Sequence, residues 1–64
     1  MKDLKNTKAL LLALAQGKKI NNEDWAINEY CFIDEQGFLI DEQGEQQAWD
    51  IFDRDQGTWF EVIE

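Results

Sequence analysis

The sequence predicts an α+β domain, with one N-terminal helix followed by a four- to five-stranded antiparallel meander sheet. Apolar residues near the N-terminus recur at helical spacing, and after Gly17 they alternate with polar residues. Short acidic stretches that end in glycine separate the alternating segments, as hairpin connections do. Because 64 residues leave room for one domain only, we assign residues 1–64 to a single domain.

The helix is expected at about residues 6–16. Asn6 or Thr7 can cap its N-terminus, and Gly17 can end it. At roughly 100° per residue, the apolar side chains share one face, which we expect to pack in the core. That face consists of Leu4, Leu10, Leu11, Leu14 and Ala15. Leu12 falls outside this face, beside a small residue, and is our candidate contact in a possible homodimer.

The antiparallel sheet is expected at about residues 18–63. Alternation predicts strands at 27–34, 38–40, 47–52 and 58–63, with a short strand at 18–20 before them. The tetrapeptide Asp-Glu-Gln-Gly occurs twice, at 34–37 and 41–44, and 53–57 holds a longer variant. Aspartate at the start and glycine at the end are typical of a type I turn followed by a residue at positive φ. The first copy therefore predicts a tight hairpin.

Charge is distributed unevenly along the chain. Fourteen acids against six bases give a net charge of −8. Residues 1–19 hold five lysines and one aspartate, a net of +4, whereas residues 20–64 hold thirteen acids and Arg54, a net of −12. Binding to nucleic acid requires cations that displace counterions, so we expect no direct nucleic-acid partner. A basic protein surface would be attracted, although the same charge also serves solubility.

The composition argues against an enzyme, a cofactor or a metal site. Without histidine there is no Ser-His or Cys-His pair, and the usual proton shuttle at neutral pH is missing. Cys31 lies in a predicted strand, where a buried inert thiol is expected. One cysteine and no histidine exclude the common zinc sets. Asp53-x-Asp55-x-Gly57 matches part of a calcium loop but lacks the later glutamate ligand.

The sequence also favours a cytoplasmic protein without membrane contact. No signal peptide, lipidation motif or membrane span is visible, and the apolar run at 9–15 is too short to cross a bilayer. A lone cysteine suits a reducing compartment. Small domains often gain stability from disulfides, metals or partners. Because one cysteine cannot form an internal disulfide, oligomerisation or tight binding to a target is the expected support.

Acidic residues in the predicted turns are the candidate binding residues. In a strand, residues two apart lie roughly 6.6–6.8 Å apart, near the spacing of phosphates along a nucleic-acid strand. A row of acids could therefore mimic nucleic acid and occupy a basic channel. The candidates are Glu23, Asp24, Asp34, Glu35, Asp41, Glu42, Asp50, Asp53 and Asp55. Core packing is expected for the three tryptophans Trp25, Trp49 and Trp59, and Trp25 is the best candidate among them for a binding aromatic.

An ordered series of residues resembles a known group of proteins. It comprises Leu-Ala-Gln-Gly-Lys-Lys-Ile at 14–20, then Trp25, Tyr30, Asp34, Gly37, Asp41-Glu42, Gly44, and a closing Trp59 with Val62 and Glu64. The series resembles short bacteriophage proteins with a helix, a Gly-Lys-Lys turn, a tryptophan and a closing Trp-x-x-hydrophobic stretch. That group includes the phage Thoeris anti-defence proteins, which sequester a cyclic ADP-ribose-type signal. Similar folds occur among anti-CRISPR proteins. The resemblance spans most of the chain from Leu10.

The resemblance implies a phage-encoded, non-enzymatic inhibitor of bacterial defence in the host cytoplasm. In nucleotide-sequestering relatives the stretch before the tryptophan is often basic, but here 21–24 is Asn-Asn-Glu-Asp, without a cation for a phosphate. This departure favours an anti-CRISPR-like protein that binds a basic nucleic-acid-handling surface of an immune effector. The alternative is a sponge for a cyclic-nucleotide-type signal, bound between subunits through Lys18, Lys19, Trp25 and Arg54. A third possibility is an acidic phage protein of another role.

Overall fold

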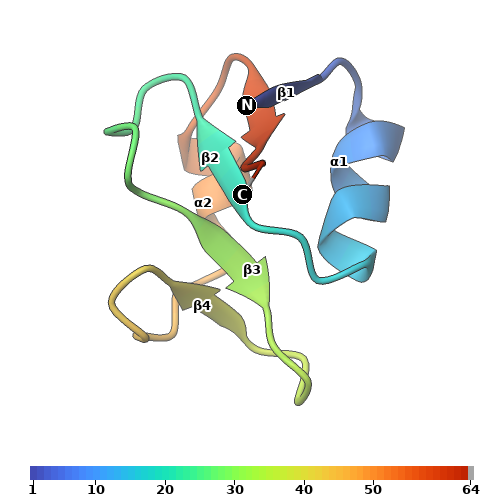
Figure 1. The fold of residues 1–64 in the computed structure, drawn as a ribbon. Helices are drawn as coiled ribbons and strands as arrows, with labels where there is room; N and C mark the ends of the chain where they lie inside the picture. The colour runs from blue at the N-terminus through green and yellow to red at the C-terminus, as the bar shows by residue number, and fades with distance from the viewer. Residues whose placement is uncertain (64) are drawn as a thin grey trace.

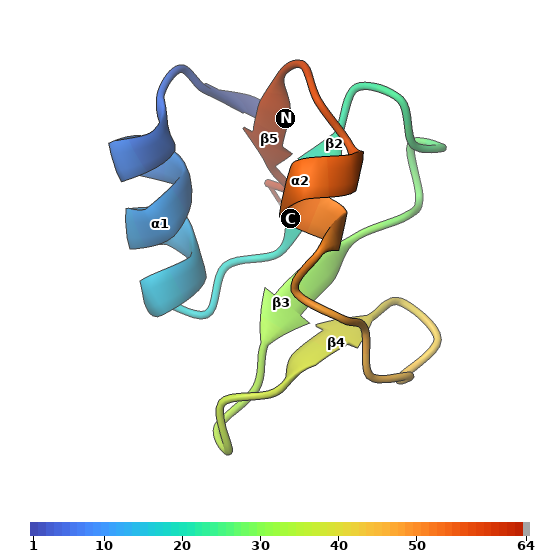
Figure 2. The same cartoon turned by 180° about the vertical axis from the view of Figure 1, so that it is seen from behind.

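The computed structural model describes residues 1–63 as an α+β fold with a five-stranded antiparallel sheet and two helices (Figures 1 and 2). In chain order the elements are β1 (Lys2–Leu4), α1 (Thr7–Ala15), β2 (Ile20–Asn22), β3 (Cys31–Ile33), β4 (Leu39–Asp41), α2 (Ile51–Arg54) and β5 (Trp59–Glu61). The predicted fold class and the helix that precedes the main sheet are confirmed. Glu64 of the predicted 1–64 domain lies outside the described residues.

The strands lie in the order β1-β5-β2-β3-β4, and every neighbouring pair is antiparallel. Strands β2, β3 and β4 form a meander, and β5 returns to lie between β1 and β2 (Figure 1). The sequence did not predict β1, because a three-residue edge strand with charged residues carries little alternation signal. Its pairing with β5 places the N-terminal segment beside the last strand of the chain.

The two Asp-Glu-Gln-Gly copies form the same turn. The Oδ1 atoms of Asp34 and Asp41 each accept hydrogen bonds from the backbone N–H groups two and four residues later, at 2.9–3.0 Å. Gly37 and Gly44 close the turns at φ +91° and +81°, which residues with a Cβ rarely adopt. The first copy joins β3 to β4 as the predicted hairpin. The second follows β4 and brings Gln46 against Ile40.

The predicted strand at 47–52 is wrong. This segment forms a turn at 49–50 and the start of α2. Trp49 and Ile51 do not share a face, because the Ile51 side chain is only 2% exposed while that of Trp49 is 53% exposed. Residues two apart share a face in a strand but lie about 200° apart on a helix, and so short a segment does not show from its sequence which of the two it forms. The predicted strand at 27–34 is likewise shortened, because 26–29 forms a turn.

Helix α1 packs its buried side against the sheet. The Asn6 side chain caps it by accepting a 2.9 Å hydrogen bond from the Ala9 N–H, and the chain turns away at Gly17, as predicted. Leu10 and Leu14 of the predicted apolar face are buried in the core. Leu4 is also buried, but its place on the helical face was wrong, because it lies in β1 and not in the helix. The assignment of the remaining two members was wrong, since Leu11 and Ala15 are exposed and Ala13 is buried in their place. The real stripe is therefore narrower and rotated toward Ala13.

Both helices contribute to the core on one face of the sheet. That core contains Ile20, Cys31, Leu39 and Trp59 from the strands, joined by Ile51 from α2 and the buried residues of α1. Figure 2 shows α2 in front of β2 and β5, and Figure 1 shows the opposite side of these strands. The prediction that Cys31 is buried is confirmed.

Candidate functional site

Four aromatic rings form a continuous series from the core to the surface beside α2. Trp25 meets Trp59 edge-on, with ring centroids 5.3 Å apart. Phe52 packs on Trp59 at 4.9 Å, and Trp49 packs on Phe52 at 6.0 Å. Trp59 is buried and Trp25 is half-buried, whereas Trp49 is exposed. The series therefore presents one indole to solvent on a support that reaches the core.

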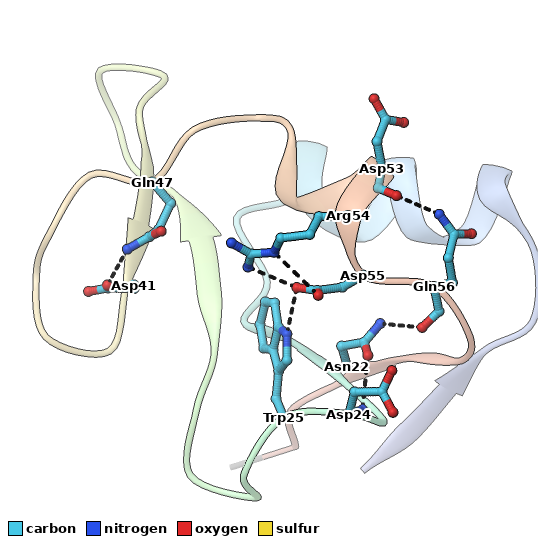
Figure 3. A network of polar contacts seen from close by, with 9 residues as sticks. All are labelled: Asn22, Asp24, Trp25, Asp41, Gln47, Asp53, Arg54, Asp55 and Gln56. Carbon is cyan, nitrogen blue, oxygen red and sulfur yellow. Dashed lines mark hydrogen bonds and ion pairs between the residues drawn. The ribbon is translucent and has the colours of Figure 1, made fainter.

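Polar contacts fix the segment that carries these rings (Figure 3). The indole Nε1–H of Trp25 donates to Asp55 Oδ2 at 2.9 Å, and the Arg54 guanidinium contacts the same carboxylate at 3.0 Å. Hydrogen bonds from Arg54 first, and then from Trp25, hold the pKa of Asp55 below its usual range. Nearby, the buried Asn22 amide donates to the Gln56 carbonyl at 3.2 Å. The end of α2 is thus tied to the loop after β2.

A groove of about 800 Å³ lies between α1 and α2. Leu10, Leu11 and Leu14 line it from α1, and Trp49 and Phe52 line it from the α2 side. Its polar rim includes Lys5, Thr7, Asp53 and Gln56. Leu11 is 59% exposed here, so the residue expected in the core instead forms part of this groove. We define the Trp49 surface as Leu11, Trp49, Phe52 and Asp53 of this groove together with the neighbouring exposed Asp50.

The nine candidate acids do not form a row along a strand. Asp41 alone of the nine lies in a strand, and the others lie in turns, loops or α2. They fall into groups at 23–24, 34–35, 41–42 and 50–55. The strand spacing that motivated a phosphate-like row therefore does not apply to them.

Four of the nine acids also bond within the protein. Glu23 accepts from the Thr58 N–H, Asp34 and Asp41 from their own turns, and Asp55 from Trp25 and Arg54. For Asp41, the hydrogen bond from the Glu45 backbone is the main reason that its pKa is lowered. Asp24, Glu35, Asp50 and Asp53 are exposed, and Glu42 is half-buried. Only Asp50 and Asp53 among the exposed acids adjoin an exposed tryptophan.

The four residues of the alternative ligand site are divided between two places. Trp25 and Arg54 line a small pocket of about 120 Å³ that also contains Glu29, Asp41 and Glu42. Lys18 and Lys19 line a separate depression beside 61–63. The Lys19 Nζ lies 4.7 Å from the centre of the Tyr30 ring, and Tyr30 also lines the small pocket. Three carboxylates in that pocket oppose a phosphate group.

Trp49 is the functional candidate that the sequence reasoning missed. The residue was assigned to the core because it alternates with Ile51, while Trp25 was selected because it falls at the junction between two predicted strands. The available signal was the position of Asp50 and Asp53, one and four residues after Trp49. In a helical segment a residue four positions later lies on the same side as the tryptophan, which places Asp53 beside the ring.

Two observations on residues 1–63 concern metal ligands and the reactivity of the cysteine. Within residues 1–63, no group of three or more histidine, cysteine or acidic side chains is arranged to hold a metal ion. Burial, followed by the nearby carboxylates of Glu42 and Asp41, raises the pKa of Cys31 to about 12. A thiol with such a pKa stays protonated at neutral pH and is a poor nucleophile.

Comparison with known proteins does not assign the chain to a family. No family model matches it, and no curated protein or solved structure shows significant similarity to it. In the described part of the chain, neither helix has the length and apolar character needed to cross a membrane.

Proposed function

We propose that this protein is a non-enzymatic binding protein that engages a basic surface of another protein through the Trp49 surface. The observation that carries the proposal is the 53% exposure of Trp49, whose ring packs on Phe52 and stands next to Asp50 and Asp53. An exposed, supported indole beside two exposed acids combines a large contact area with negative charge. Both properties suit arginine- or lysine-rich partners.

The physical roles of these groups are distinct. Tryptophan is the best of the aromatic residues for binding a cation over its ring, and a desolvated pair contributes about 2 kcal/mol. Tryptophan is also prominent among the few residues that dominate interface energies. The acids accelerate encounter with a basic partner and orient it, while the apolar part of the groove accepts the methylene stems of its side chains. Net charge of −8 extends this attraction beyond the contact itself.

The resemblance to phage anti-defence proteins suggests the class of partner. An immune effector that handles nucleic acid carries a basic channel, and an acidic protein competes for it by covering its cations. We place this interaction in the host cytoplasm, where such effectors act. The nucleotide-sponge alternative has less support, because its two lysines line one depression while Trp25 and Arg54 line another. Three carboxylates also line the pocket that contains Trp25 and Arg54.

A pull-down from bacterial lysate at low and high salt tests the proposal. The bait variants are Trp49→Ala and the double variant Asp50→Asn/Asp53→Asn. Matched controls are Phe38→Ala, which removes another exposed aromatic side chain, and Asp24→Asn/Glu35→Asn, which removes two exposed acids elsewhere. We expect a basic protein to be retained by wild type and both controls at low salt, and to be lost from the two bait variants and at high salt.

The eluate is also assayed for nucleotides. A bound nucleotide without a protein partner would contradict the proposal and favour the sponge. Equal loss of the partner from Asp50→Asn/Asp53→Asn and from Asp24→Asn/Glu35→Asn would show that net charge, and not the position of the acids in the Trp49 surface, holds the partner.

A further inference from the structure

The second face of the sheet is also apolar. Because successive side chains in a strand point to opposite faces, Phe32, Ile40 and Phe60 point away from the core that their neighbours Cys31, Leu39 and Trp59 enter. Phe32 lies directly opposite Ile40 in the register of β3 and β4. Each of these three side chains is partly exposed. In Figure 1 this face of β2 and β3 is turned to the viewer, and α2 lies behind it.

The same face is close to neutral in an otherwise acidic molecule. Asp3 lies opposite Phe60, so it points to this side of β1. Lys19 precedes the buried Ile20, and its Nζ lies over the Tyr30 ring at 4.7 Å. A backbone hydrogen bond of 2.8 Å from Val62 to Lys19 extends the β5–β2 pairing and adds another half-buried apolar side chain. One cation and one carboxylate thus accompany the apolar residues.

Antiparallel sheets with one face in water usually alternate apolar and polar residues. In β3 and β4 the alternation is absent, since Cys-Phe-Ile and Leu-Ile are apolar on both faces. On the central strand β2 this face carries Asn21, which is buried and donates to the carbonyl groups of Ala26 and Glu29. The partly exposed apolar side chains on either side of it indicate an interaction surface. The residues that the structure describes place neither helix over Phe32 and Ile40, because α1 and α2 contribute to the core on the other face.

We propose that a second copy of this chain packs against this face, sheet on sheet, to form a dimer. We define the dimer face as Asp3, Lys19, Phe32, Ile40, Phe60 and Val62. Two sheets packed face to face lie about 10 Å apart with their side chains interdigitated. The Trp49 surface lies on the other side of each sheet, so the dimer displays two partner-binding surfaces that face outward.

Size and charge select a second copy as the occupant. The molecule measures 27 × 25 × 22 Å, so one whole face is of the same order as the about 800 Å² per partner that a standard interface buries. A flat partner of equal size is needed to cover it. In a two-fold arrangement the same patch meets itself. A patch with one cation and one carboxylate tolerates this, whereas the acidic turns would repel their copies.

Sedimentation equilibrium of the full chain across a range of concentrations tests the dimer. The test variants are Phe32→Glu and Val62→Glu. Val62 lies outside the strands, so Val62→Glu is expected to fold even if Phe32→Glu does not. The controls are Leu12→Glu, on the exposed side of α1, and Trp49→Ala. We expect each test variant to raise the dimer dissociation constant at least tenfold, and the controls to leave it unchanged. Near-ultraviolet circular dichroism checks the fold.

Salt dependence separates this dimer from the proposed partner binding. Two copies of net charge −8 repel one another, so screening strengthens an apolar dimer while it weakens attraction to a basic partner. We therefore expect tighter association of wild type at about 0.5 M than at about 0.05 M salt. A wild-type chain that stays monomeric at high salt, or a dimer dissociated by Leu12→Glu but not by Val62→Glu, would overturn the proposal without affecting the Trp49 surface.

Discussion

The indole Nε1–H of Trp25 donates a 2.9 Å hydrogen bond to the carboxylate of Asp55, which lies 30 residues later in the chain. Trp25 belongs to the loop after β2, and Asp55 ends α2. The same tryptophan contacts Trp59 edge-on in the core. One residue therefore connects the core, the loop and the helix that positions Trp49, so the candidate binding surface depends on a contact that is distant in sequence.

Replacing Trp25 should destabilise the fold by an amount that depends on which of its contacts are removed. Trp25→Phe keeps a ring against Trp59 but removes the donor to Asp55, whereas Trp25→Ala removes both. We expect Trp25→Ala to lower the free energy of unfolding by about 2–3 kcal/mol, since half-burial reduces the usual cost of truncating a core aromatic. Trp25→Phe should fall between the alanine variant and wild type. Urea unfolding followed by far-ultraviolet circular dichroism measures this, and an unchanged Trp25→Ala midpoint would contradict the role.

Acid should destabilise the protein through Asp41 and Asp55. Hydrogen bonds hold both carboxyl pKa values lower in the folded chain than the ordinary value of about 3.9. The folded state thus binds protons less readily, so this stabilisation is complete above about pH 4 and is lost as pH falls through the folded values. Asp41→Asn and Asp55→Asn should each reduce the loss of stability between pH 5 and pH 2. Unfolding curves at several pH values measure the free energy of unfolding in this range. If both variants lost as much stability as wild type, the prediction would be refuted.

The turns and the first helix were the most predictable parts of the fold, because their signals are local. Asp34 and Gly37 encode their turn through a side chain and a φ angle within four residues, and Asn6 caps α1 in the same way. The position of β5 between β1 and β2 depends on pairing with residues 55–59 positions earlier in β1 and 37–41 positions earlier in β2, which no local pattern records. The segment at 47–52 was misassigned because its burial is decided by distant rings, notably Trp59.

The candidate site was less predictable than the fold for the same reason. Acidic residues are visible in the sequence, but their bonding is not. Glu23 and Asp55 were selected as exposed binding residues, yet each accepts hydrogen bonds from residues about thirty positions away. Trp49 was expected in the core but is exposed, whereas Trp25 is half-buried through its contacts with Trp59 and Asp55.

Gly57 should be less tolerant of alanine than Gly44. Both have positive φ, +90° and +81°, so either substitution costs about 1 kcal/mol of backbone strain. A Cβ at Gly44 meets open space, whereas one at Gly57 would overlap the Glu23 carboxylate that accepts the Thr58 N–H. We expect Gly57→Ala to be the more destabilising by urea unfolding.

Glu23 provides the control for this comparison. In the background Glu23→Ala the overlap is absent, so the destabilisation caused by Gly57→Ala should fall to that caused by Gly44→Ala. Equal costs of the two alanine substitutions in the wild-type background would contradict the close approach of Glu23 to Gly57.

Cys31 should be unreactive in the folded protein. Burial is the main cause of its raised pKa of about 12, and the thiol is therefore protonated at pH 8. We expect labelling by a chromogenic disulfide reagent to be slow at pH 8 and to become rapid in urea. Because the thiol pKa is higher in the folded state, its stabilising contribution is complete below the unfolded value of about 8.5 and is lost as pH rises above it. Rapid labelling of the folded chain would refute burial.

The exposure and acidic setting of Trp49 should be visible in fluorescence quenching. Trp59 is buried and Trp25 half-buried, so a collisional quencher should act mainly on Trp49, and Trp49→Phe should remove most of the quenchable emission. Asp50 and Asp53 concentrate cations and repel anions around the indole. Caesium should therefore quench more strongly than iodide, relative to each ion's effect on free tryptophan. Asp50→Asn/Asp53→Asn should reduce that difference, whereas Asp24→Asn/Glu35→Asn should preserve more of it. Equal quenching by the two ions in wild type would remove the electrostatic basis of the proposed binding surface.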